Sequence, residues 1–453
     1  MTASTPASTR ERSPARLALA AVCLGFVMIT LDATIVNLAL PAIGAEFGQR
    51  STAALQWVVD SYTVALAAFL LTWGEAGDRW GSRRVFEIGV AVFVLASIAC
   101  AAADSLPWLV AARAVQGAGA AALLPSSLAL IVHQFPEVGA RARALGVWGG
   151  MSGVGLAAGP MLGGLAVGLA DWRLVFAVNV PVGLIAIALT RRYVTETTPR
   201  RQTRIDGVGQ VLGTAALACV VAGLIEAGHA GWADATTLVL VGAGVVAGIA
   251  FVVAEKAIAA PVLPLGVLRV RAFAVATAIG GLFNFCLYGT LFCLALFLQR
   301  VWHLSALVAG LALVPLTLAV GLNAFVSGRL THRFGSRPPI VVGSLTALVG
   351  AAGMAVLPDE RSPVLLVVFS LVFGFCSLAM PAMTSLAMNA LPGKAGIAAG
   401  VLNAARQTGG AVGVALVGGL LPGTAMWIVA GGYAAIAALT GLLRLGRRKA
   451  QSS

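Results

Sequence analysis

Two acidic side chains that interrupt long apolar stretches are the residues of this sequence best placed to do chemistry. Asp32 lies midway along the apolar stretch 16–40. Removal from water disfavours the ionised form of a carboxyl group, so such a group can bind a proton from one side and release it to the other. The alternative is an acid tied permanently to a buried partner. Asp60 is the second such acid. Asp60 shares a helical face with Trp57. The alternative interpretation is that Asp60 lies in a solvated vestibule and has no functional role.

Two arginines also lie inside apolar stretches, where a permanently charged guanidinium must find an acid, water or a bound molecule. Arg113 shares a helical face with Gln116, and Arg406 shares one with Asn403 and Gln407. We therefore expect neither arginine to face lipid.

Small residues form a regular pattern in the fifth apolar stretch. Gly155, Gly159 and Gly163 are spaced four residues apart, with Pro160 and Gly164 beside them. Small residues at this spacing let helices approach closely, and Pro160 removes one hydrogen bond within the helix. The pattern predicts a closely packed helix that can bend and slide, or else static packing alone.

A ten-residue pattern occurs twice, at Gly74–Arg83 and again at Gly328–Arg337. Both copies read G-x-x-x-[D/H]-R-[W/F]-G-S-R, and each follows the second apolar stretch of a block of six. The repeat predicts two related six-helix halves. A substrate site would then lie between them, near the middle of the membrane.

The first copy of this pattern is a candidate gate. Gly81 permits a tight turn. Asp78 can accept hydrogen bonds from the N-terminal amides of a helix, or pair with an arginine in a clamp that holds one conformation closed. Alternatively, the arginines serve only to orient the chain in the membrane. The gating candidates are Gly74, Asp78, Arg79, Gly81, Arg83 and Arg84.

Composition indicates that the solvent around these residues is lipid. Of the 453 residues, 59% are hydrophobic and 10% are charged, whereas a soluble domain carries roughly 25% charged residues. A membrane-spanning helix needs about 20 mostly apolar residues. The sequence predicts an all-α integral membrane protein with fourteen such helices, near 16–40, 53–76, 85–103, 107–132, 142–169, 172–190, 207–228, 234–255, 272–298, 304–328, 338–357, 362–391, 394–420 and 424–443.

The net charge of +13 is concentrated in every second linker. This positive-inside distribution predicts that both termini are cytoplasmic, and it argues against nucleic-acid binding. The predicted organisation is a cytoplasmic N-terminal tail (1–15), an N-terminal six-helix bundle (16–190), a basic cytoplasmic linker (191–206), an extra transmembrane pair (207–255), a cytoplasmic linker (256–271), a C-terminal six-helix bundle (272–443) and a basic C-terminal tail (444–453).

Metal, cofactor and enzyme chemistry are not indicated. The six cysteines lie inside predicted helices without a CxxC pair, and the four histidines are scattered along the chain. Lys394 follows Gly393 but precedes an alanine, so it forms no phosphate-binding loop for ATP. We expect no metal, no cofactor and no catalytic residue.

Five motifs follow one another along the chain: Leu31–Pro41, Gly74–Arg84, Arg113–Gly117, Gly155–Gly164 and Trp172–Gly183. Together they resemble the major facilitator superfamily, and specifically its fourteen-helix drug:proton antiporter family. The motif between the second and third helices departs from the family pattern at Ala76 and Ser82, which replace the usual Leu and a basic residue. The general pattern is most similar to actinobacterial antibiotic exporters such as those for methylenomycin.

The resemblance implies a fold of two six-helix bundles plus two extra central helices. Asp32 would be the proton-coupling carboxyl and Arg113 its relay partner. Asp78 and Arg79 would gate the cytoplasmic side, and the glycines at 155–164 would govern antiport. His332 replaces the acid in the second loop, so that gate would be weaker. The expected substrate-binding residues are Asn37, Trp57, Asp60, Gln116, Asn284, Tyr288, Asn403, Arg406 and Gln407.

The expected function is proton-driven export of small hydrophobic drugs or antibiotics across the inner (cytoplasmic) membrane by a monomer, with the proton gradient in place of a cofactor. The alternative is a facilitator that imports or exports a metabolite. No acid occurs at mid-depth in the second six-helix block, so neutral, monocationic or anionic substrates are favoured over dications. Arg113 and Arg406 would suit an acidic compound.

Overall fold

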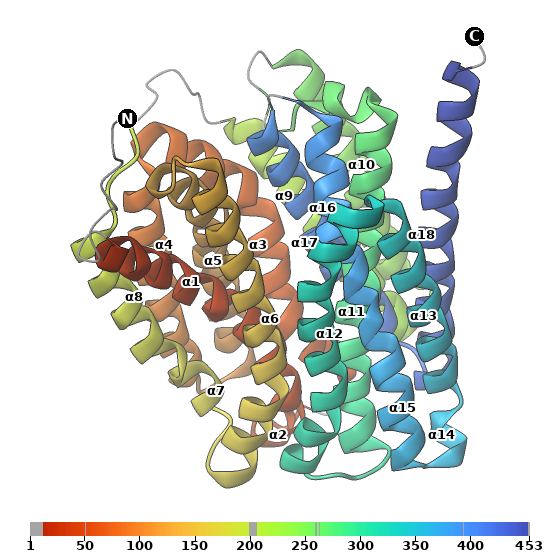
Figure 1. Cartoon of the computed structure of the whole chain (residues 1–453). Coiled ribbons are helices and arrows are strands. Elements are labelled where there is room, and N and C mark those ends of the chain that lie inside the picture. Colours follow the sequence, from red (N-terminus) through yellow and green to blue (C-terminus); the bar gives the residue numbers. More distant parts are fainter. Residues whose placement is uncertain are drawn as a thin grey trace, which may run out of the picture.

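The computed structural model describes residues 12–49, 51–198, 206–258, 261, 263–392 and 394–451. Most of the predicted N-terminal tail lies outside these residues, as does the arginine-rich part of the linker 191–206. All regular structure among the described residues is helical. Figure 1 shows the helices side by side in one bundle, with α18 along its edge.

The first half of the chain forms six membrane-length helical segments, two of which are broken. Contacts join α1 to α6 and α8, and α3 and α4 to α5. The elements are α1 (Arg12–Ile35), η1 (Val36–Leu38), α2 (Leu40–Glu46), α3 (Thr52–Trp80), α4 (Ser82–Ala101), α5 (Leu106–Gln134), α6 (Val138–Leu169), α7 (Leu174–Ala177) and α8 (Asn179–Tyr193).

Two further helices, α9 (Gly207–Ala230) and α10 (Ala235–Ala257), precede the second half. Helix α9 packs against both α3 and α17, so it lies where the halves meet, whereas α10 packs mainly on α9. The remaining elements are η2 (Leu265–Arg269), α11 (Arg271–Arg300), α12 (Ala306–Phe334), α13 (Arg337–Ala355), α14 (Leu357–Glu360), α15 (Pro363–Gly374), η3 (Phe375–Leu378), α16 (Ala379–Ala390), α17 (Ala395–Gly418) and α18 (Pro422–Gln451).

Thirteen helical segments among the described residues are long and apolar enough to cross a membrane. The predicted stretch 394–420 is not among them, although it forms the 24-residue helix α17. Asn403, Arg406 and Gln407 lower its apolar character, and it packs between α11 and α3. The sequence therefore predicted a helix here correctly, but the count of fourteen rests on a segment whose polar residues set it apart from the others.

Three predicted spans are interrupted rather than continuous. The first changes to a 3₁₀ turn at Val36, the sixth divides into α7 and α8 at Val178, and the twelfth changes to a 3₁₀ turn at Phe375. The segments on both sides of each break are mostly apolar, so hydropathy alone does not mark these breaks, although Asn37 and Asn179 directly follow the first two. The first two lie close to the buried acid Asp32, as described below.

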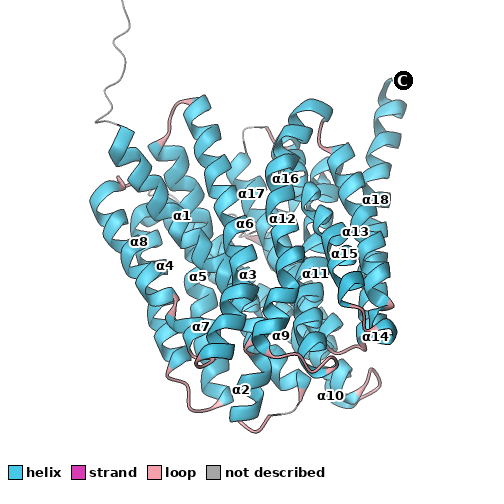
Figure 2. Ribbon diagram, turned by 60° about the horizontal axis from the view of Figure 1, so that its bottom comes forward, coloured by secondary structure: helices cyan, strands magenta, loops and turns pink. Residues whose placement is uncertain are grey.

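Glycine ends the second helix of each half in the same way. Gly81 after α3 has φ +95° and Gly335 after α12 has φ +79°. Residues with a Cβ rarely adopt this backbone conformation. The repeated sequence pattern therefore corresponds to a repeated turn. Figures 1 and 2 place the last turns of α18 at one end of the bundle and the short helices α2 and α14 at the other.

Candidate functional site

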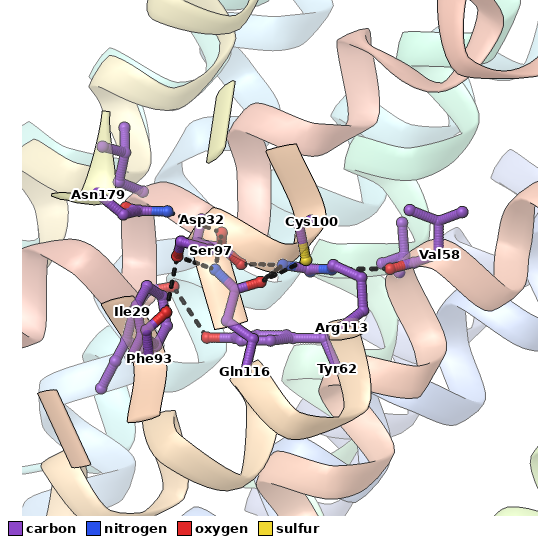
Figure 3. Close-up of polar contacts among 12 residues, drawn as sticks. Ile29, Asp32, Val58, Tyr62, Phe93, Ser97, Cys100, Arg113, Gln116 and Asn179 are labelled. Atoms are coloured by element: carbon purple, nitrogen blue, oxygen red, sulfur yellow. Dashed lines mark hydrogen bonds and ion pairs between the residues drawn. The ribbon is translucent and has the colours of Figure 1, made fainter. Parts of the chain in front are cut away.

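A buried ion pair between Asp32 and Arg113 joins α1 to α5 in the first half (Figure 3). Asp32 is 0% exposed and Arg113 is 1% exposed. Arg113 Nη1 donates to Asp32 Oδ2, and Arg113 Nε donates to the carbonyl oxygen of Val58 at 2.9 Å. The structure thus brings together the two residues expected to couple protons, one from α1 and one from α5.

Two amide side chains complete the surroundings of Asp32. Gln116 Nε2 donates to Asp32 Oδ1 at 2.9 Å and to Ser97 Oγ at 2.8 Å, while its Oε1 accepts from Arg113 Nη1 at 2.6 Å. Asn179 Nδ2, at the start of α8, donates to Asp32 Oδ1 at 3.2 Å. Gln116 was expected to bind substrate, but here it orients the acid and the arginine.

Aromatic rings hold the Arg113 guanidinium from the side. Its Cζ lies 4.3 Å from the centre of the Tyr62 ring and 5.7 Å from that of Phe176. Such contacts favour a cation, especially away from water. Burying an ion pair is costly unless its remaining donors and acceptors are bonded. The network meets that condition, so in this conformation Asp32 has the buried partner that the alternative interpretation required.

Asp60 differs from Asp32 because its carboxyl group has no hydrogen-bond partner among the described residues. It is 0% exposed, and neither oxygen forms a hydrogen bond with a described residue. The interpretation of Asp60 as a solvated vestibule residue is therefore wrong for this conformation. Trp57 and Val64, on the same helix, pack in one apolar cluster with Ala411 of α17. An uncompensated buried carboxyl is unfavourable unless it is protonated or meets a ligand.

The second half brings three expected substrate-binding residues together. Arg406 Nε donates to Asn284 Oδ1 at 3.3 Å, and its Nη1 donates to Asn403 Oδ1 at 3.4 Å. The Tyr288 ring lies against α17, 3.1 Å from the position that a Cβ on Gly410 would occupy. Arg406 has no carboxylate within 4 Å among the described side chains.

The other expected binding residues do not join either cluster. Asn37 is 3% exposed in η1, and its Oδ1 accepts no hydrogen bond from the described residues. Gln407 is buried next to Arg406 in α17, and Trp57 packs toward α9 and α17. Their substrate-binding roles stay predictions.

The glycines of α6 fit closely against α1, the helix that carries Asp32. A Cβ on Gly155 would overlap the side chain of Thr30, and one on Gly159 would overlap Thr34. A Cβ on Gly163 would lie 2.6 Å from the Ile35 carbonyl oxygen. Gly164, on another face of α6, meets Ala306 of α12 in the same way, at 2.7 Å. Helix α6 therefore contacts both α1, which carries Asp32, and α12 of the second half.

The candidate gate loop is bonded by residues that follow α8, a contact that the sequence did not predict. Glu196, beyond the end of α8, accepts from the backbone amides of Arg83 at 2.8 Å and Arg84 at 3.1 Å, at the N-terminus of α4. Thr197 Oγ1 accepts from the Ser82 amide at 2.8 Å. A carboxylate at a helix N-terminus is favourable because the orphan amides and the helix dipole both attract it.

The remaining gate residues are more exposed. Asp78 and Arg79 are exposed at the end of α3, and neither forms an ion pair with a described residue. The Arg83 side chain pairs with Glu87 at 3.0 Å. Gly74 lies against Pro125. A clamp between the halves through Asp78 therefore stays a prediction, while Glu196 assumes the role of accepting from helix amides.

Sequence reasoning missed Ser97 and Glu196, and it noted Asn179 only within a motif. Ser97 and Asn179 are polar residues in apolar helices, which is a usable signal. Glu196 follows two arginines in a linker, and nothing in the sequence pairs it with residues 82–84.

Comparison with known protein families agrees with the helical fold and the buried polar residues described above. The sequence profile of the Major Facilitator Superfamily matches residues 22–414. The chain belongs to this superfamily of membrane transporters and is not an enzyme.

Several relatives with drug-related names cover nearly all of the chain. It is 38% identical over 419 residues to the multidrug resistance protein Stp of Mycobacterium tuberculosis, covering 91% of this chain and 76% of that protein. It is 36% identical over 431 residues to the methylenomycin A resistance protein of Streptomyces coelicolor, covering 94% and 90%. The tetracenomycin C resistance and export protein of Streptomyces glaucescens is 36% identical over 422 residues, covering 92% and 78%.

Solved structures share the fold at low identity. The xylose transporter XylE from E. coli, in a partially occluded inward-open conformation, has a TM-score of 0.67 at 12% identity and covers 94% of this chain and 97% of its own. The human organic anion transporter MFSD10 has a TM-score of 0.65 at 14% identity, covering 96% and 100%. These similarities support the major-facilitator-type fold alone.

Proposed function

We propose that this protein is a proton-coupled antiporter that exports small hydrophobic drugs or antibiotics across the cytoplasmic membrane by alternating access, with both termini in the cytoplasm. The observation that carries the proposal is the fully buried Asp32–Arg113 ion pair, on helices that belong to the same half. The names of the relatives support drug export, because they are resistance and export proteins.

Protonation of Asp32 would change the energy of this conformation. The ion pair loses its attraction when the carboxyl becomes neutral, and Arg113 is then left as an uncompensated buried charge. A proton can shift a conformational equilibrium only by binding the two states with different affinity. The network supplies such a difference, because it stabilises the ionised form of Asp32 specifically.

The contacts of α6 offer a route from the proton site to the second half. Gly159 packs on α1 one turn beyond Asp32, and Gly164 packs on α12. Closely packed helices move as units, so a displacement of α1 would be passed to the contact between the halves. This mechanical link is part of the proposal.

We assign the substrate to the region lined by α3, α11 and α17. Arg406 with its two amide partners comes from one side, and Asp60 comes from α3, which packs on α17. One unpartnered carboxyl and one arginine without a carboxylate suit neutral, monocationic or anionic compounds. Two buried acids would be needed for a dication.

Transport into inverted membrane vesicles tests this proposal. Labelled puromycin, methylenomycin A and tetracenomycin C serve as probes, with and without an imposed pH gradient. We expect the parent protein to concentrate at least one probe only when the gradient is present. Asp32→Asn keeps the size of the side chain but cannot titrate, so it should abolish this accumulation while downhill exchange survives.

The control variant is Glu226→Gln, which makes the same acid-to-amide change in α9, away from the ion pair. It should accumulate probe as the parent does. If Asp32→Asn concentrates probe as strongly as the parent, Asp32 is not the coupling residue and Asp60 takes its place. Gradient-independent movement of every probe by the parent would instead indicate a facilitator.

A further inference from the structure

The three described side chains that form hydrogen bonds with Asp32 all act as donors. Arg113 Nη1 donates to Oδ2, and Gln116 Nε2 and Asn179 Nδ2 both donate to Oδ1, at 2.9 and 3.2 Å. This arrangement suits an ionised carboxylate, which only accepts. A protonated carboxyl group carries an O–H donor and needs an acceptor. None of the three atoms now bonded to Asp32 can accept its proton.

Gln116 is not free to supply that acceptor. Its Oε1 already accepts from Arg113 Nη1 at 2.6 Å, and its Nε2 also donates to Ser97 Oγ at 2.8 Å. Ser97 Oγ in turn donates to the Phe93 carbonyl oxygen at 2.8 Å. Turning the Gln116 amide over would break hydrogen bonds at both of its ends.

Asn179 differs from Gln116 because its amide oxygen is not already engaged by a described residue. It is 1% exposed, its Nδ2 donates to Asp32, and its Oδ1 is buried without a hydrogen-bond partner among the described residues. Buried polar atoms are nearly always bonded, so one left unpartnered needs an explanation. A half-turn about the Cβ–Cγ bond exchanges the oxygen and nitrogen of an amide with almost no change of shape.

We propose that Asn179 is a positioning residue whose amide inverts when Asp32 binds a proton: Nδ2 donates to the carboxylate, and Oδ1 accepts from the protonated carboxyl. The proposal rests on the proton coupling proposed above. The proton stays on Asp32 throughout and Asn179 remains neutral, so the inversion lets one residue satisfy both forms of the acid.

The position of Asn179 in the fold favours such a motion. It is the first residue of α8, directly after the break at Val178 that separates α7 from α8. Helix α8 packs on α1 and α4. The other titratable or charged groups that face Asp32 are Arg113 on α5, Tyr62 on α3 and Cys100 on α4. Asn179, unlike Tyr62 and Cys100, does not titrate, and unlike Arg113 it is neutral.

The experiment follows Asp32 itself rather than transport. Infrared difference spectra are recorded against pH on purified full-length protein in lipid nanodiscs, without substrate. The carboxyl C=O band of Asp32 is the one that disappears in Asp32→Asn. Three further variants are compared: Asn179→Leu, which can neither donate nor accept; Asn179→Ser, which can do both; and Thr190→Val, a loss of a buried polar atom elsewhere on α8.

The position of the carboxyl band reports whether the protonated group has an acceptor. We expect Asn179→Leu to move the band of the protonated Asp32 carboxyl to higher wavenumber, as for a group that has lost its acceptor. Asn179→Ser should restore the band toward the parent position, and Thr190→Val should match the parent. Size-exclusion chromatography confirms folding before each comparison.

Two results would overturn the inference. One is an Asn179→Leu variant whose protonated carboxyl band lies at the parent position. The other is a parent Asp32 band that does not change between about pH 4 and pH 9, the range over which carboxyl groups of proteins titrate. The vesicle assay separates this from the proposed function: a carboxyl band that depends on Asn179 without uphill transport removes only the antiport, whereas uphill transport with unaffected spectra removes only the role of Asn179.

Discussion

Each half of the molecule carries an arginine within a helix, and the two arginines differ in burial and in partners. Arg113 on α5 is 1% exposed and pairs with the carboxylate of Asp32. Arg406 on α17 is only partly buried, and it donates to the amide oxygens of Asn284 and Asn403, at 3.3 and 3.4 Å. The first half thus compensates a fully buried positive charge with a carboxylate, while the partly buried arginine of the second half bonds to neutral amides.

The difference is consistent with the different tasks proposed for the two halves. A carboxylate can lose its negative charge by binding a proton, so under the proposal the first half responds to protonation. The amide oxygens bonded to Arg406 do not titrate. An arginine whose partners among the described residues are neutral retains attraction for an anion or a polar ligand group. The comparison therefore supports the proposal of a proton site in the first half and a ligand site in the second.

The largest effect is expected from breaking the first pair. Arg113→Leu leaves Asp32 as an uncompensated buried charge, which should lower the free energy of unfolding by about 3–5 kcal/mol. The measurement is denaturation of purified protein in mixed micelles by increasing SDS, followed by circular dichroism.

The double variant Asp32→Leu/Arg113→Leu is the control for this prediction. Replacing both members of a buried pair by apolar residues is often neutral or stabilising. We expect it to recover most of the lost stability but none of the pH-driven transport. A double variant as unstable as Arg113→Leu would mean that packing, and not charge, holds these helices together.

The sequence predicted the members of both clusters better than it predicted their contacts. Asp32 and Arg113 were recognisable because charge inside an apolar stretch is costly and rare. That Gln116 would bridge them depended on the relative rotation of α1 and α5, which hydropathy does not determine. Asn179 and Glu196 act across more than 100 residues of sequence, on Asp32 and on the amides of Arg83 and Arg84.

The fold, too, was predicted in its elements better than in its details. The long apolar stretches predicted the helices, and Gly81 predicted a turn that recurs at Gly335, because a positive φ has a residue-specific cause. The breaks at Val36 and Val178 came only with the structure, because hydropathy does not distinguish a break from a continuous helix. The polar character of α17, which complicates the helix count, comes from Arg406 and its neighbours, the residues that we propose as a ligand site.

A smaller effect is expected in the second half. Arg406→Leu removes two hydrogen bonds to neutral amides without leaving a buried charge, so the loss of stability should be about 1–2 kcal/mol. The same SDS denaturation measures it, and the matched variant is Arg113→Leu. Equal losses of unfolding free energy in Arg113→Leu and Arg406→Leu would contradict the distinction between the two arginines, of which only Arg113 is paired with a carboxylate. Uptake of the three antibiotic probes should fall in Arg406→Leu, and the residual uptake should still depend on the pH gradient.

The smallest effect is expected from an ion pair at the surface of the first half. Arg173 Nη2 donates to Glu46 Oε1 at 2.6 Å, and Trp172 Nε1 donates to Glu46 Oε2 at 2.5 Å. The Arg173 hydrogen bond and then the Trp172 hydrogen bond lower the pKa of Glu46. The side chains of Arg173 and Glu46 are 32% and 40% exposed, so water and salt screen the pair.

A lowered pKa fixes the direction of the pH dependence. The stabilisation is fully present above the pKa of Glu46 in the unfolded chain, about 4.3, and is lost as the pH falls through the lower pKa of the folded protein. Glu46→Gln should therefore cost less than about 1 kcal/mol at neutral pH and nothing in strong acid. Thermal melting at several pH values and salt concentrations measures this, with added salt reducing the difference from the parent. A loss of stability in Glu46→Gln as large as that in Arg113→Leu, or one unaffected by salt, would contradict this prediction. It would show that burial is not what distinguishes the Asp32–Arg113 pair from the Glu46–Arg173 pair.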